Sequence, residues 1–259
     1  MEQHLQGKGS GMMSLPVEIK VNIDGNVGEA LSLLGEPQGP VRKRLVWFAE
    51  SRSGIADGHL LLDSRVMVRF RSGDTPDELT VKLRPCAKGQ LVGRFSSPFD
   101  EESFEYKIEE DWSGNRQVVA ASATSSHPQG VLLDSVAPGA DAAAPLTARQ
   151  LQFFRACVPA LHATGLVALG PIASTKFSDV PLDDLEVDLE RWTVADLDFL
   201  ELSIRVKLKD EEKADEFEAR AKRKQRKLES AVMDHGLVIS ENPETKTRRV
   251  ITTLVANHH

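Results

Sequence analysis

The chain has 259 residues and a formal net charge of −7, with 41% hydrophobic and 27% charged residues. These values are ordinary for a globular protein with one large domain or two small ones. The acidic balance argues against nonspecific nucleic-acid binding as the main task. No run of about 18 apolar residues is present, so we expect no transmembrane helix. The two cysteines lack metal-site spacing and the N-terminus lacks an apolar signal segment, so we expect free thiols in a cytoplasmic protein.

The first half of the chain is dominated by predicted strands. Residues 1–15 contain Gly and Met without periodicity and indicate a flexible leader. A short helix is predicted at 29–34, because Gly35 and Pro37 close it. Residues 122–146 are rich in Ala, Ser, Gly and Pro, which indicates a connection. The predicted strands of this half are 17–23, 44–50, 64–71, 78–84 and 104–110.

The second half of the chain contains further predicted strands and two predicted helices. Thr147 caps an apolar-periodic helix that runs to residue 158. A long charged helix is predicted at 210–235, ended by Gly236. The β-branched residues at 248–255 indicate a last strand, followed by a tail at 256–259. Further strands are predicted at 170–177, 185–191 and 199–207. About eight strands with few helices favour a largely antiparallel α+β fold.

The strands carry charged residues of both signs at alternate positions. Glu18 and Lys20 alternate with Val17, Ile19 and Val21, and the other strands follow the same pattern. Because the side-chain period of a strand is two, each charged set lies on one face of the sheet. Two structures explain the pattern: a sheet with a wet outer face, or a closed barrel with a charged, water-filled interior.

The two sets of charges point to a specific chemistry. A polyanionic ligand needs several fixed cations, whereas Mg²⁺ or Mn²⁺ needs two or three carboxylates and accepts phosphate oxygens. A site with both is suited to metal-assisted phosphoryl transfer. The basic candidates are Lys20, Arg69, Arg71, Lys82, Arg84, Lys107, Lys176 and Arg205, and the acidic candidates are Glu18, Glu105, Glu109, Glu186, Asp188, Glu190 and Glu201.

Six short segments follow one another in a characteristic order. They are Glu18-Ile19-Lys20, Val68-Arg69-Phe70-Arg71, Leu79-Thr80-Val81-Lys82, Ser174-Thr175-Lys176-Phe177, Leu185-Glu186-Val187-Asp188 and Glu201-Leu202-Ser203. In this order they resemble the motifs of the CYTH superfamily, also called triphosphate tunnel metalloenzymes. Its members include thiamine triphosphatases, inorganic tripolyphosphatases and class IV adenylyl cyclases.

The resemblance implies one domain over residues 16–255, an eight-stranded closed barrel or tunnel with flanking helices. It implies a small triphosphate-containing polyanion as partner, with Mg²⁺ or Mn²⁺ as cofactor, and neither nucleic acid nor membrane. Glu18 and Lys20 are then the catalytic candidates. The metal candidates are Glu18, Glu186, Asp188 and Glu201, with Glu190 on the same side. The phosphate-binding candidates are Lys20, Arg69, Arg71, Lys82, Arg84, Lys176 and Arg205.

The chain departs from the family pattern at three positions. Pro16 stands in place of a Glu, Ser174 in place of a Lys, and Ser203 in place of a second Glu. Three hypotheses therefore stay open: a metal-dependent triphosphatase, a non-catalytic polyphosphate- or nucleotide-binding module of the same fold, and an interaction domain with solvent-facing charged strands.

Overall fold

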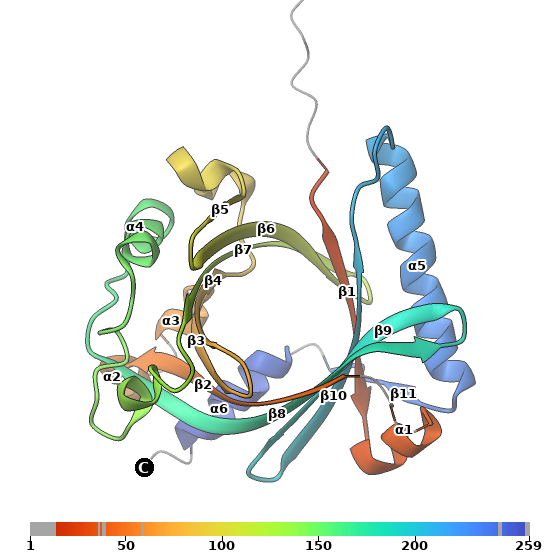
Figure 1. Cartoon of the computed structure of the whole chain (residues 1–259), viewed down its shortest axis with the longest axis horizontal. Helices are drawn as coiled ribbons and strands as arrows, with labels where there is room; N and C mark the ends of the chain where they lie inside the picture. Colours follow the sequence, from red (N-terminus) through yellow and green to blue (C-terminus); the bar gives the residue numbers. More distant parts are fainter. Residues whose placement is uncertain (1–13, 36, 38–39, 58–59, 243–244, 257–259) are drawn as a thin grey trace, which may run out of the picture.

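The computed structural model describes residues 14–35, 37, 40–57, 60–242 and 245–256. Most of the predicted leader and the last three residues of the predicted tail lie outside this part of the chain. The described residues form a closed β-barrel with helices around it, and Figure 1 looks into its interior. The α+β barrel expected from the sequence is therefore confirmed.

Nine of the described strands close the barrel, in the spatial order β1-β10-β9-β8-β2-β3-β4-β7-β6, and the pairing of β1 with β6 completes the ring. This last pairing is parallel, whereas the other barrel pairings are antiparallel. The barrel strands are β1 Val17–Asp24, β2 Val41–Ser51, β3 Val66–Gly73, β4 Asp77–Leu83, β6 Phe104–Ser113, β7 Arg116–His127, β8 Leu166–Leu182, β9 Leu185–Val194 and β10 Leu197–Val206. Two short strands, β5 Phe99–Glu101 and β11 Val238–Ile239, extend the sheet beside β6 and β1.

The barrel has nine strands where eight were expected, and two segments adopt a different structure from the predicted one. β7 lies partly within the predicted connection at 122–146. It is a strand because Ala121 and Ala123 are small enough to pack beneath a covering helix, while Ser122 and Thr124 line the interior. The predicted strand at 248–255 is instead helix α6, Lys246–Ala256. Burial of Val250, Ile251 and Val255 on one helical face outweighs their high β-propensity.

α4 and α5 lie against the outer side of the barrel, whereas α6 packs against part of the inner strand faces. Thr147 caps α4 as predicted, since its hydroxyl accepts the backbone N–H of Gln150. Within the described ranges, no helix is both long and apolar enough to cross a membrane. Besides α6, the helices are α1 Val27–Leu33, α2 Arg52–Asp57, α3 Leu60–Asp63, α4 Ala148–Cys157 and α5 Ala214–Asp234.

Most of the hydrophobic core lies between the barrel wall and α4 or α5, whereas a third cluster, which includes α6, lies on the inner faces of the strands. Phe153 and Phe154 of α4 pack against the outer side of the β3-β4-β7-β6 wall. Phe217 and Leu228 of α5 cover β1 and its neighbours, and Val250 of α6 packs into a third cluster. Because the apolar residues that alternate with the charged ones point outward into the first two clusters, the charged residues must point inward.

Candidate functional site

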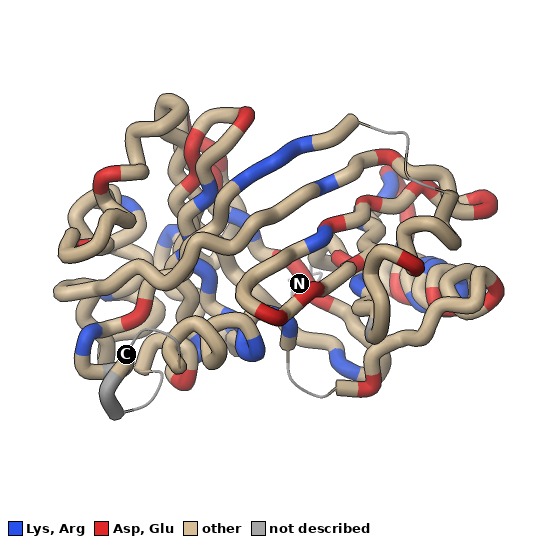
Figure 2. The backbone as a smooth tube through the Cα atoms, turned by 90° about the horizontal axis from the view of Figure 1, so that it is seen from below, with Lys and Arg blue, Asp and Glu red and all other residues tan. Residues whose placement is uncertain are grey.

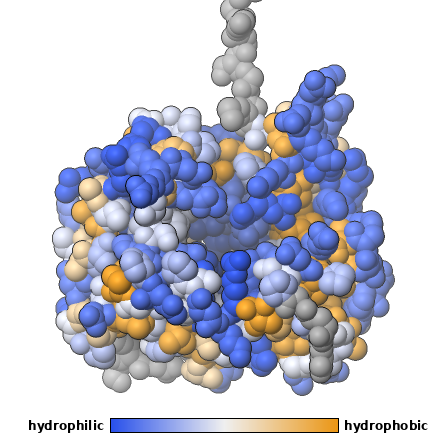
Figure 3. Space-filling model, in the orientation of Figure 1, coloured by the Kyte–Doolittle hydropathy of each residue, from blue (hydrophilic) through white to orange (hydrophobic). Residues whose placement is uncertain are grey.

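The polar strand faces line a cavity of about 1010 Å³ that runs into the barrel. Its described lining contains twelve Lys or Arg residues and ten Asp or Glu residues, so the cavity carries a small positive excess although the chain is acidic. Figure 3, in the orientation of Figure 1, shows the mouth of the cavity as a hydrophilic hollow at the centre of the molecule. Figure 2 shows both signs of charge along the strands. The charged faces therefore line an interior, which argues against the solvent-facing interaction domain.

Three carboxylates gather where the barrel closes. Glu18 lies on β1, and Glu109 and Asp111 lie on β6. The parallel pairing of these strands sets Glu18 directly opposite Asp111. One oxygen from each of the three carboxylates lies within 4.8 Å of the other two, with Glu109 and Asp111 buried. We call this group the acidic triad, and it is the described cluster whose spacing suits a metal ion.

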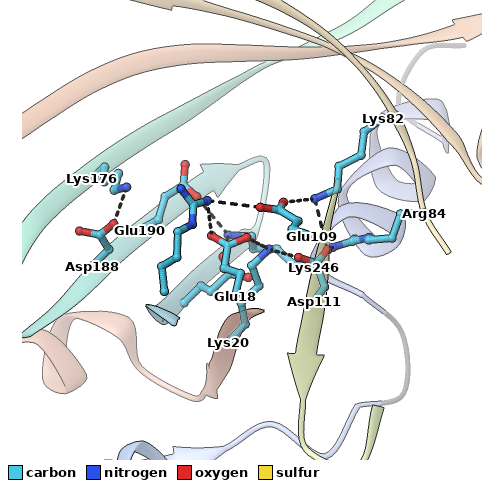
Figure 4. Close-up of polar contacts among 12 residues, drawn as sticks. Glu18, Lys20, Lys82, Arg84, Glu109, Asp111, Lys176, Asp188, Glu190 and Lys246 are labelled. Atoms are coloured by element: carbon cyan, nitrogen blue, oxygen red, sulfur yellow. Dashed lines mark hydrogen bonds and ion pairs between the residues drawn. The ribbon is translucent and has the colours of Figure 1, made fainter. Parts of the chain in front are cut away.

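Short ion pairs surround the acidic triad (Figure 4). Lys20 Nζ lies 2.8 Å from Glu18 and 3.3 Å from Asp111. Arg84 contacts Asp111 at 2.9 Å, and Lys82 lies 3.2 Å from both carboxylates of β6. A fourth cation, Arg205, is more exposed and reaches Glu109 at 3.5 Å. Each triad carboxylate is thus balanced by at least one cation.

These ion pairs shift the pKa values of the site in consistent directions. Burial alone would raise the pKa of Glu18, but Lys20 and Lys82 lower it from 4.5 to about 2. The pKa of Asp111 lies far below its usual range, because Lys20, Lys82 and Arg84 outweigh the effect of burial. Burial alone would lower the pKa of Lys20, but Glu18 and Asp111 raise it above its ordinary value. The triad is therefore ionised and Lys20 is protonated at neutral pH.

A second cluster forms around Glu190 of β9, with side chains from β8, β3 and α6. Ser174 of β8 donates a hydrogen bond to the Glu190 carboxylate at 3.0 Å. Arg71 lies 3.6 Å from it, and Lys246 of α6 lies 3.7 Å from it. Burial would raise the pKa of Glu190, but Lys246 and Arg71 hold it well below its usual range. Lys246 also lies 3.4 Å from Glu201. We call these residues the Glu190 cluster.

Arg69 of β3 differs from the other cations of the tunnel. Burial and the neighbouring Arg71 lower the pKa of Arg69 to about 9. Its Nε is buried, and among the described residues the side chain has neither a hydrogen-bond partner nor an ion pair within 4 Å. Arg69 is still a cation at neutral pH, so its donors are available to an anionic ligand.

The structure brings nearly all the site residues predicted from the sequence into this cavity. Its lining includes Glu18, Lys20, Arg69, Arg71, Lys82, Arg84, Lys176, Asp188, Glu201 and Arg205. Glu186 does not line it. This carboxylate is exposed and faces a separate hollow beside α5, with Lys207 and Arg220. Of the four predicted metal carboxylates, only Glu18 belongs to the acidic triad. Asp188 instead pairs with Lys176 at 2.7 Å.

Two site residues escaped the sequence analysis for different reasons. Asp111 continues the alternation of Glu105, Lys107 and Glu109, and that pattern could have revealed it if the strand had been extended by one residue. Lys246 has no such signal, because it opens a helix where the sequence indicated a strand two residues later. Its place in the tunnel depends on how α6 packs.

The sequence matches no protein-family model, and no curated protein matches it either. Solved structures do resemble the chain. A candidate adenylyl cyclase from Hippeastrum, described as having a dominant triphosphatase activity, superposes with a TM-score of 0.58 at 13% identity, over 91% of this chain and 95% of its own. A candidate adenylate cyclase from Bacillus halodurans gives 0.57 at 10% identity, over 91% of this chain and 97% of its own.

At these identities the likeness establishes the fold. The chain has the barrel of these cyclase-type proteins, which confirms the fold implied by the resemblance to the CYTH superfamily. Activity does not transfer with a fold and has to be argued from the site itself.

Proposed function

We propose that the chain binds a triphosphate-containing ligand in its tunnel and hydrolyses it with Mg²⁺ or Mn²⁺. The observation that carries the proposal is the acidic triad, set within a cation-lined cavity of about 1010 Å³. Cations alone would suit any polyanion. A compact set of three carboxylates in their midst suits a hard divalent cation that shares phosphate oxygens with the protein.

The triad fits such an ion by the chemistry of its donors. Glu18, Glu109 and Asp111 offer only carboxylate oxygens, which Mg²⁺ and Mn²⁺ prefer. When bound there, the ion would act as a Lewis acid toward the phosphoryl oxygens. Lys20 and Lys82 now balance the same carboxylates, so these ammonium groups must turn toward the phosphates when an ion enters. We therefore expect stronger metal binding when triphosphate is present.

In the proposed reaction, water adds to the terminal phosphorus and the bond from that phosphorus to the bridging oxygen breaks. Orthophosphate and the shortened diphosphate leave, and one proton passes to the medium. Lys20 is held protonated by Glu18 and Asp111, so its role is electrostatic. It offsets the negative charge on the phosphoryl oxygens in the transition state.

The test is phosphate release from tripolyphosphate, thiamine triphosphate and ATP, over a series of Mg²⁺ and Mn²⁺ concentrations. We expect metal-dependent release with at least one of them. Glu18→Gln should lower it by about a hundredfold or more while ligand binding remains, because the cations are untouched. Glu186→Gln is the matched control, since this exposed carboxylate lies outside the tunnel.

A second function, binding without hydrolysis, is favoured by one observation. Every triad carboxylate already has a cation within 3.3 Å, so the protein satisfies these charges without a metal. In that case tripolyphosphate should raise the melting temperature, because a ligand at a hundredfold excess over Kd adds about 2.7 kcal/mol to the free energy of unfolding. Phosphate release by the wild type under any metal would exclude this alternative, and binding without any release would support it.

A further inference from the structure

Lys246 occupies an unusual position for a lysine. It is the first residue of α6, its side chain is only 8% exposed, and it lines the tunnel cavity. Its Nζ is buried and makes no hydrogen bond to any described residue, although Glu201 and Glu190 lie 3.4 and 3.7 Å away. The ammonium also lies 4.1 Å from the centre of the Trp192 ring. Burying an ammonium without hydrogen bonds is costly, which indicates that a partner is missing.

Arg69 also has a donor without a hydrogen-bond acceptor among the described residues. This donor, Arg69 Nε, is buried, and Arg69 lines the same cavity. Arg69 interacts electrostatically with Glu190, which links it to the side of the tunnel where Lys246 lies. Two cations with unmatched donors on one side of the tunnel define a place for an acceptor with several oxygens.

Glu190 partly fills this need in the ligand-free protein. Arg71 and Lys246 contact it at 3.6 and 3.7 Å, distances longer than the 2.7–2.9 Å that is typical of charge-assisted hydrogen bonds. A phosphoryl group carries more charge and more acceptor oxygens than a carboxylate, so it can satisfy donors that Glu190 leaves unmatched. The N-terminal end of α6 adds its partial positive charge at the same place.

We propose that Lys246 and Arg69 form a subsite for one phosphoryl group of the ligand, and that the Glu190 carboxylate competes with that group for the same cations. This inference rests on the proposed function, because it assumes a polyphosphate ligand in the tunnel. It also gives the ligand a direction, with one phosphoryl group anchored at α6 and the reacting group at the acidic triad. Lys246 is then a specificity residue for ligands long enough to reach both.

The experiment is calorimetric titration with tripolyphosphate in EDTA, so that binding is measured apart from hydrolysis. Lys246→Gln should raise Kd about tenfold or more, and Lys246→Arg should recover part of the loss. Arg248→Gln, on the exposed side of the same helix, should bind like the wild type. Glu190→Gln should lower Kd by about threefold or more, because the competing carboxylate is neutralised. A role of Glu190 in holding the ligand predicts the opposite change.

The results separate this inference from the proposed function. Wild-type affinity in Lys246→Gln, or weaker binding in Glu190→Gln, overturns the subsite while the tunnel function stands. If the wild type does not bind tripolyphosphate, both proposals fall. Should thermal unfolding show that Lys246→Gln is not folded, Glu190→Gln and Arg69→Gln decide the question, since Arg69 lies on β3 and does not depend on α6.

Discussion

The two charged clusters of the tunnel contain similar residues in different states. Around the acidic triad, Lys20 reaches Glu18 at 2.8 Å and Arg84 reaches Asp111 at 2.9 Å. Around Glu190 the ion pairs span 3.4 to 3.7 Å, and Lys246 keeps donors without acceptors. The difference suggests two roles for one kind of chemistry. Tight pairs hold carboxylates in place, whereas loose pairs leave cations ready for an incoming anion.

The largest expected effect is on the free energy of unfolding, and it tests whether the two clusters differ. Asp111→Asn removes the shared partner of Lys20, Lys82 and Arg84 and leaves three buried cations to repel one another. We expect a loss of about 3–5 kcal/mol in the free energy of unfolding. Glu190→Gln should cost only about 1–3 kcal/mol, because its ion pairs are longer. Urea unfolding of both variants measures the difference, and equal losses would show that the two clusters are not distinct.

The acidic triad also predicts how stability depends on pH. Glu18 has its pKa lowered to about 2 in the folded protein, and the pKa of Asp111 is lowered as well. A depressed pKa contributes stability that is fully present above the unfolded value, 4.5 for Glu18, and is lost as pH falls through the folded value. Stability should therefore decline between about pH 4.5 and pH 2.

The variant Glu18→Gln measures how much of this acid-induced loss of stability comes from the acidic triad. In Glu18→Gln the acid loss should be smaller by up to about 3 kcal/mol, since one coupled carboxylate no longer titrates. Glu186→Gln, changed outside the tunnel, should follow the wild-type curve. The measurement is the urea midpoint over a pH series. Identical curves for Glu18→Gln and the wild type would mean that Glu18 is not held by its cations.

The smallest expected effect separates binding from stability. Arg69→Ala should weaken tripolyphosphate binding by about 2 kcal/mol, as for a hydrogen bond to a charged group, with little change in unfolding. Lys82→Ala should weaken binding and also destabilise the fold, because Glu109 and Asp111 lose a cation. Titration calorimetry beside thermal unfolding tests both variants. A large stability loss in Arg69→Ala would place Arg69 among the structural cations.

Much of the site follows from the sequence, because strand period is a local property. Alternation in 17–23 and 64–71 predicted which side chains share a face, and Lys20, Arg69 and Arg71 do line the interior. The alternation could not say which face is inside. That choice depends on where the apolar residues pack, and α4 and α5 cover the outer wall.

Tertiary structure alone decided which charges meet. Glu18 faces Asp111 because β1 and β6, which lie far apart in the chain, pair in parallel to close the barrel. Lys246 reaches Glu190 because burial of apolar side chains folds 246–256 as a helix against the barrel. Glu186 shares a strand face with Asp188 yet lies outside the cavity. Local pattern specifies the face of a strand, whereas register and packing between distant segments specify neighbours, and the chemistry of this tunnel depends on those neighbours.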